Sequence, residues 1–339
     1  MIKILNFLFL LVCFLTAISL EASPKKLLSD YNFFKKIETQ IPNENVIPYH
    51  LASPLFSDYT YKFRFVSMPN GEFAQYNYNE VFNFPVGTKI IKTFAYPVDD
   101  RDLSLGFQLL ETRLLIKDKN GWYPLSYIWK EDQDDAELKY IGKTINAKWI
   151  DKNGVEQVNR YRVPNINQCG SCHNLNKVIM PIGPKGRNLD VDFFYQHGME
   201  NQIDYWEKIN ILENIPSNRK NPTAIWNLES ETIENRARAY LDINCAHCHR
   251  EGGSAGNSGF YLSHEETNNT SLGIMKKPVA AGRGSGGLKY VIKPGISEES
   301  ILLYRMASTD PGVMMPELSR NMEHKEAIPL IKEWIDSIN

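Results

Sequence analysis

Two copies of one short pattern, Cys-x-x-Cys-His, constrain this chain more than any other feature. Thiols three residues apart lie on one face of a helical turn, where they can bond the two vinyl groups on one edge of a porphyrin. The histidine that follows is then placed to ligate the iron. We therefore expect two haem c groups, and the residues that hold them are Cys169, Cys172 and His173, and Cys245, Cys248 and His249.

Two other interpretations of these cysteines are possible. The two Cys-x-x-Cys pairs could together form one zinc site, but zinc leaves the histidine after each pair unexplained. Two local disulfides are also conceivable in an oxidising compartment. A fifth cysteine, Cys13, lies in a segment that we expect to be removed.

The N-terminus has the pattern of a secretory signal peptide. Lys3 precedes an apolar run over residues 4–18, which is followed by small residues. We predict a signal peptide over residues 1–22 and a mature protein that is periplasmic or otherwise exported. After cleavage, all four remaining cysteines belong to the two haem motifs.

Charge and length narrow the functional classes. The chain has 339 residues, and its 38 basic and 40 acidic residues leave a net charge of −2. It has no basic block that favours nucleic acid and no apolar stretch, beyond the signal, long enough to span a membrane. A chain of this length can form more than one domain.

The region 23–165 has the pattern of an antiparallel β-rich domain. Aromatic residues alternate with polar ones from Tyr59 to Val66, the period of a half-buried strand. Asn-Gly pairs at 70–71, 120–121 and 153–154 favour turns between antiparallel strands.

The positions of the two motifs divide the rest of the chain into two predicted segments. Residues 166–228 form the first haem-binding segment and a linker, with a short helical stretch near 203–212. Residues 229–339 have the order of a class I cytochrome c: a helix capped by Ser230, the second motif, a loop, a short helix capped by Ser297, and a terminal helix. The predicted fold class is α+β, an antiparallel β-rich domain carrying one haem followed by a small all-α cytochrome c-like domain.

An electron carrier needs a sixth iron ligand, and methionine is the usual one where the potential is high. Met315 is the first candidate at the second haem and Met314 its rival. At the first haem Met180 is the first candidate, and His197, Met199 or an open position are alternatives. An open position would permit chemistry as well as electron transfer.

Glycines at 282, 284 and 287 match the dinucleotide-binding fingerprint, but no strand is predicted before them. A loop that folds around a haem edge explains them better, with Arg283 or Lys289 able to pair with a haem propionate.

With these residues in view, the chain resembles a family of exported dihaem c-type cytochromes. The resemblance implies two covalent haems and an exported redox partner with parallel β-helix repeats. It extends over nearly the whole mature chain, and it rests on residues 54–58 (PLFSD), 84–88 (FPVGT), 92–94 (KTF), 111–115 (ETRLL), 163–165 (VPN), 183–185 (GPK), 244–249 (NCAHCH), 282–287 (GRGSGG) and 314–316 (MMP), together with the first motif.

We therefore expect an exported dihaem cytochrome that transfers electrons between redox partners. Two other functions remain open. One is a dihaem peroxidase-like enzyme in which one haem iron keeps an open position. The other is a binding module whose β domain recognises a partner or a glycan.

Overall fold

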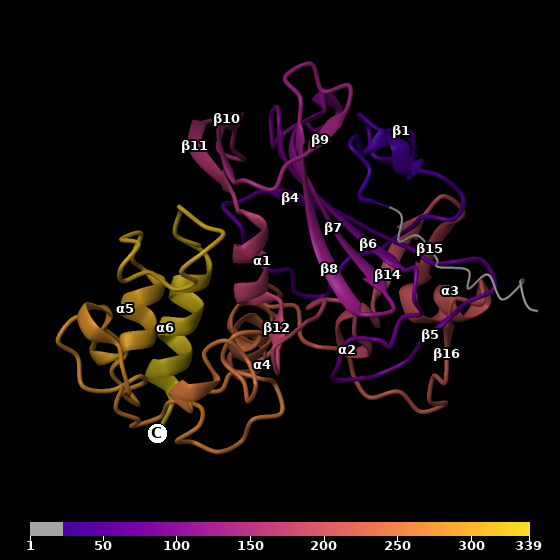
Figure 1. Cartoon of the computed structure of the whole chain (residues 1–339). Helices are drawn as coiled ribbons and strands as arrows, with labels where there is room; N and C mark the ends of the chain where they lie inside the picture. The colour runs from indigo at the N-terminus through magenta and orange to yellow at the C-terminus, as the bar shows by residue number, and fades with distance from the viewer. Residues whose placement is uncertain (1–22) are drawn as a thin grey trace, which may run out of the picture.

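A computed structural model describes residues 23–339 (Figure 1). The predicted signal peptide and Cys13 lie outside the described residues. Within them, no helix combines the length and apolar content that a membrane span requires.

A six-stranded antiparallel sheet forms the centre of the N-terminal half (Figure 1). Its order is β3-β4-β6-β7-β8-β9, with β3 at Ile47–Pro48, β4 at Tyr61–Ser67, β6 at Lys89–Pro97, β7 at Phe107–Asp118, β8 at Gly121–Trp129 and β9 at Ala136–Leu138. The predicted alternation from Tyr59 is confirmed as β4, and the predicted turn at Asn120 joins β7 to β8.

Two smaller pairs complete the β region. Strands β10 (Lys143–Ile150) and β11 (Glu156–Val163) form a hairpin around the predicted turn at Asn153. Strands β1 (Phe34–Lys36) and β2 (Ile41–Pro42) pair near the N-terminus. The prediction for Asn70-Gly71 is wrong: the strand after it, β5 (Ala74–Gln75), pairs in parallel with β16 (Leu212–Glu213). Long-range pairing there replaces a local hairpin.

The two faces of the large sheet are covered differently. One face is apolar and packs under the N-terminal segment, with Phe33, Phe34, Phe65, Leu114 and Tyr127 in its core. On the other face, the β10–β11 hairpin covers one end through Trp149 and Tyr161. Trp206 covers the other end. Ile179, which follows the first haem motif, packs in the same cluster as Trp206.

Short elements connect the sheet to the C-terminal region. They are α1 (Ile166–Cys172), β12 (Asn174–Leu175), β13 (Val178–Ile179), α2 (Gly186–Leu189), β14 (Asp192–Tyr195), β15 (Gly198–Asn201) and α3 (Gln202–Lys208). Helix α1 and strand β13 both contact β8, so the first motif packs against the sheet as expected. Helix α3 confirms the short helical stretch near 203–212.

The prediction of an all-α cytochrome c-like domain over residues 229–339 is wrong. Only three α-helices form there: α4 (Ile233–Leu241), α5 (Ile301–Met306) and α6 (Ala327–Ser337). Between α4 and α5 the chain consists mainly of loops and short 3₁₀ turns, with two isolated parallel bridges, Ile274–Ile292 and Tyr290–Ser300. Glycines and prolines from 252 to 295 interrupt any helical run.

The helix caps also differ from the prediction. Thr232, not Ser230, caps α4 and accepts a hydrogen bond from the Asn235 N–H. Ser297 begins a 3₁₀ turn, and α5 starts after Ser300. The terminal helix α6 is confirmed. It buries Ile331, Trp334 and Ile335 against α4.

Candidate haem-binding site

Helix α1 positions the first pair of thiols. Asn165 and Gln168 form a capping box: the Asn165 side chain accepts the Gln168 N–H at 3.0 Å, and the Gln168 side chain accepts the Asn165 N–H at 2.9 Å. Cys169 and Cys172 stand one turn apart on this short helix, and its contact with β8 buries Cys169. Two thiols on one helical face are the geometry that attachment to one porphyrin edge requires.

His173 follows the helix with its ring already oriented. Its Nδ1 lies 2.8 Å from the carbonyl oxygen of Met180, which the β12–β13 hairpin brings back to it. Because a carbonyl only accepts, Nδ1 carries the proton and the Nε2 lone pair is left to bind a metal. Burial lowers the pKa of His173 to about 4, which keeps the ring neutral. This is the state and orientation of a proximal iron ligand.

The second motif begins where α4 passes into a π-helical turn, Asp242–Ala246. Asn244 anchors this turn: its side chain donates to the Tyr240 carbonyl at 2.9 Å and accepts the Phe56 N–H at 2.8 Å. Cys245 lies in the turn, and the amide of His249 donates to its carbonyl at 2.9 Å. Cys245, Cys248 and His249 therefore share one compact turn.

The ring of His249 is half-buried beside Phe260. Burial lowers its pKa, and its centroid lies 5.0 Å from that of Phe260 in an edge contact. Among the described residues, its Nδ1 has no hydrogen-bond partner of good geometry. A hydrogen bond with the Phe260 backbone acts against burial and raises the pKa of the ring. A neutral imidazole in this position can bind a metal through a ring nitrogen.

A cavity of about 940 Å³ opens beside the second motif. Cys245, Cys248 and His249 line it, and so does Cys172 from the first motif. Its walls include Tyr240, Phe260, Leu262, Ile301 and Leu302, and the cationic side chains that reach it are Lys276, Arg305 and Arg320. Cofactor pockets are of this size and are mostly apolar, with a few polar groups. Thiols, an imidazole, apolar walls and cations fit a haem that carries two propionates.

The structure separates the candidate sixth ligands. Met315 lines the cavity, whereas Met314 is buried elsewhere with 4% of its surface exposed. Met180 contacts His173 through its backbone, on the Nδ1 side of that ring. His197 and Met199 lie on the exposed β14–β15 hairpin, where His197 pairs with Glu200 at 2.6 Å. The assignment of Met315 and Met180 as ligands stays a prediction.

Two further side chains line the cavity that no sequence spacing singled out. Met306, at the end of α5, is buried against it. The ring of His324 stacks on Phe56 at 4.1 Å, and its Nδ1 lies 3.1 Å from the Tyr240 hydroxyl. Only tertiary packing brings these residues to Cys245.

The glycine-rich loop at 282–287 forms a 3₁₀ turn, not the strand-turn-helix of a dinucleotide site. Residues Val279, Ala280 and Ala281 just before it line the cavity. Arg283 is exposed and pairs with Asp310.

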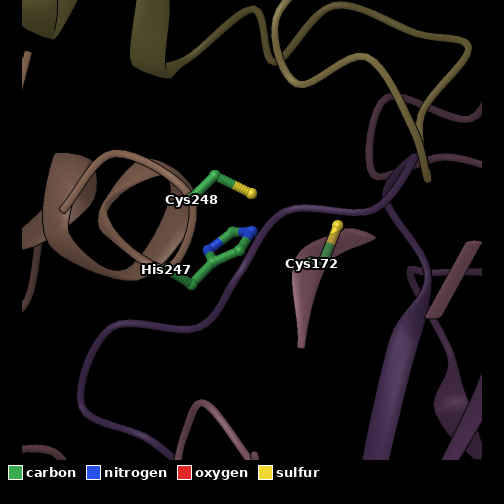
Figure 2. A group of neighbouring side chains, drawn as sticks. All are labelled: Cys172, His247 and Cys248. Carbon is green, nitrogen blue, oxygen red and sulfur yellow. The ribbon is translucent and has the colours of Figure 1, made fainter. Parts of the chain in front are cut away.

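The second thiols of the two motifs come together. The ligand atoms of Cys172, His247 and Cys248 all lie within 4.8 Å of one another, and Figure 2 shows them pointing into one space. All four cysteines of the described chain are free. A hydrogen bond from Cys172, with help from His247, lowers the pKa of Cys248. Thiolate and imidazole ligands suit zinc, but the cluster is not the four-thiol site that the sequence suggested.

Comparison with known proteins adds no further assignment. No family model, curated protein or solved structure matches this chain.

Proposed function

We propose that this chain is an exported dihaem c-type cytochrome that transfers electrons between redox partners. Haems attached at Cys169 and Cys172 and at Cys245 and Cys248 would supply one-electron chemistry, with His173 and His249 as proximal ligands. The observation that carries the proposal is that thiols of both motifs line one large cavity together with the imidazole of His249.

The placement of Cys172 beside Cys248 supports transfer between two centres in one chain. Cys172 and Cys248 would each hold one of the two haems, and their sulfur atoms lie within 4.8 Å of each other. Haems held by these two residues would supply one-electron chemistry at two neighbouring sites of one chain.

The protein's own residues prepare each centre. The Met180 carbonyl holds the Nδ1 proton of His173 and so fixes the ring orientation. Met315 and Met306 present thioethers to the second site. Arg305 and Arg320 supply positive charge at the same cavity, where it favours the reduced iron.

Haem content tests the proposal directly. Chain matured with a haem-attachment system is expected to carry two covalent haems by mass and pyridine haemochrome assay. Replacing Cys169 and Cys172 with alanine should remove one haem, and replacing Cys245 and Cys248 the other. A chain that never carries covalent haem contradicts the proposal. Carbon monoxide binding to one haem would favour the peroxidase-like alternative with an open iron position.

The partner is tested separately. The family resemblance implies an exported redox protein with parallel β-helix repeats. Mixing the reduced cytochrome with such a protein should oxidise or reduce the haems in a stopped-flow experiment, whereas an unrelated redox protein of similar potential should react more slowly.

A second candidate function, zinc binding, is supported by a separate observation. Cys172, His247 and Cys248 offer three zinc ligands in the chain without haem. Zinc and haem compete here, because both use the two sulfurs. Zinc binding by haem-free chain that is lost in His247→Ala, while this variant still acquires two haems, would assign the zinc site to the apoprotein alone.

A further inference from the structure

The face of the large sheet that meets the first motif carries a row of cations. Arg64 on β4 stands directly opposite Lys92 on β6, and Lys92 stands directly opposite Arg113 on β7. Lys62 lies two residues before Arg64, on the same face. Like charges directly opposite one another destabilise a sheet, so this cation row (Lys62, Arg64, Lys92 and Arg113) needs an explanation.

Only one member of the cation row is neutralised. Arg113 forms a bidentate ion pair with the buried Glu111, which also accepts the Tyr161 hydroxyl at 2.6 Å. Within residues 23–339, Lys62, Arg64 and Lys92 form no ion pair. The nearby carboxylate of Asp58 is occupied by donors from Asn159, Asn321 and Met322.

The three unpaired cations also make few hydrogen bonds. Arg64 is 7% exposed, and its buried Nη2 has no partner in the described chain. Its Nη1 reaches only the Lys62 carbonyl, at 3.3 Å. The Lys62 amine donates to the Thr60 carbonyl at 2.7 Å, and the Lys92 amine lies 4.8 Å from the centroid of the Phe94 ring. Burial lowers the pKa of Lys62 to about 7 and lowers that of Lys92.

The cation row lies beside the first haem motif. Apolar clusters close the sheet face on both sides of it, and α1 and β13 contact the neighbouring strand β8. Arg113 of the cation row is on β7, the strand that pairs with β8, and Ile179 of β13 packs in the apolar cluster that includes Leu115 of β7. Arg64 is a buried cation without a counter-charge, and Lys62 and Lys92 beside it are half-buried. A buried charge without a partner is unfavourable, so an anion bound at Arg64 would stabilise this face.

We propose that the cation row is an anion site that binds carboxylate or small oxyanion groups next to the first motif. Two sources have this chemistry. One is the pair of propionates of a haem attached at Cys169 and Cys172, which rests on the proposed function. The other is a free inorganic oxyanion such as sulfate, which needs no haem at all.

Redox titration of the holoprotein tests the first source. Removing a cation beside a propionate favours the oxidised, more positive iron, so Arg64→Gln and Lys92→Gln should each lower the potential of one haem only. Lys119→Gln is the matched control, because Lys119 is exposed at the far end of the β7–β8 hairpin. It should leave both potentials unchanged.

Thermal unfolding tests the second source. The full chain with Cys169→Ala and Cys172→Ala, which cannot attach the first haem, should gain Tm on addition of sulfate at constant ionic strength. In that background Arg64→Gln should raise Tm without sulfate, because it removes an unpaired buried charge, and should lose the sulfate-dependent gain. If Arg64 only supports the fold, Arg64→Gln should lower Tm both with and without sulfate.

The two experiments distinguish the two sources of the anion. They also distinguish a failure of the anion site from a failure of the proposed function. A lowered potential identifies haem propionates as the ligand, and a sulfate-dependent Tm that Arg64→Gln abolishes identifies a free oxyanion. If neither the potential nor the sulfate-dependent Tm changes in the Arg64→Gln variant, the anion site is wrong. If wild-type chain carries no haem, the proposed function fails, while the sulfate experiment on that chain still decides the anion site.

Discussion

The sulfur atoms of Cys172 and Cys248 lie within 4.8 Å of each other, although each ends a separate Cys-x-x-Cys pair (Figure 2). One comes from the end of α1 on the β sheet, and the other from the turn after α4. The two motifs are thus one structural unit. Their first thiols, Cys169 and Cys245, do not belong to this cluster.

This contact predicts a disulfide between the motifs before haem is attached. Mild oxidation of haem-free chain should join Cys172 to Cys248, because their sulfur atoms lie within 4.8 Å of each other and the pKa of Cys248 is lowered, which favours the reactive thiolate. Peptide mass mapping under non-reducing conditions checks the pairing. Local Cys169–Cys172 and Cys245–Cys248 disulfides would contradict it.

Met315 and Met314 should respond differently to truncation. Met315→Ala should lower the potential of one haem and open that iron to carbon monoxide, since Met315 lines the cavity. Met314→Ala should leave both spectra unchanged but lower the free energy of unfolding by about 2–5 kcal/mol, because it removes a buried side chain. Spectra and denaturant unfolding of both variants check this. If Met306→Ala instead gives the spectral change, Met306 is the ligand.

Acid should destabilise the junction around Asp242. Burial raises the pKa of this carboxyl, but the charges of Lys185 and Arg187 outweigh burial, and the net pKa is lowered. Because the folded-state pKa lies below the unfolded value of about 3.9, the stabilisation is present above that value and is lost as the pH falls through the folded pKa.

Asp242→Asn should therefore lower stability at pH 7 by about 3–5 kcal/mol, because it leaves Lys185 without its carboxylate and Arg187 with Glu265 alone. Its unfolding free energy should also depend less steeply on pH between about 5 and 2. Urea unfolding across this range checks both effects. The matched control is Asp134→Asn, since Asp134 forms an exposed pair with Lys130 and should have little effect.

The capping box of α1 should affect the first haem selectively. Asn165→Ala removes the acceptor for the Gln168 N–H and should cost about 1 kcal/mol. Because α1 holds Cys169 and Cys172 in place, haem attachment at the first motif should fall while attachment at the second is unchanged. Haem stoichiometry of single-motif variants measures this. Equal loss at both motifs would mean that the effect is global.

Local features of the fold could be predicted from sequence, because a few neighbouring residues determine them. The hairpins at Asn120 and Asn153 and the apolar spacing of the terminal helix α6 are of this kind. Asn70-Gly71 uses the same turn chemistry, but β4 pairs with β6 and not with the strand after the turn. Long-range strand pairing outweighs the local preference there.

The C-terminal region failed as a prediction for a related reason. Helix, motif, loop and terminal helix occur in the predicted order, but the loop pairs with itself through a bridge from Ile274 to Ile292, which no local pattern predicts. Residue order alone does not specify an all-α domain when glycine and proline interrupt the helices.

By itself, the sequence determined the chemistry of each motif: two thiols on one helical turn with a histidine after them, because i and i+3 positions share a face. Only the tertiary structure decided that Cys172 meets Cys248, that Met315 rather than Met314 lines the cavity, and that Arg64, Lys92 and Arg113 stand in one row. These residues are far apart along the chain, and strand register and helix packing, which depend on the whole core, bring them together.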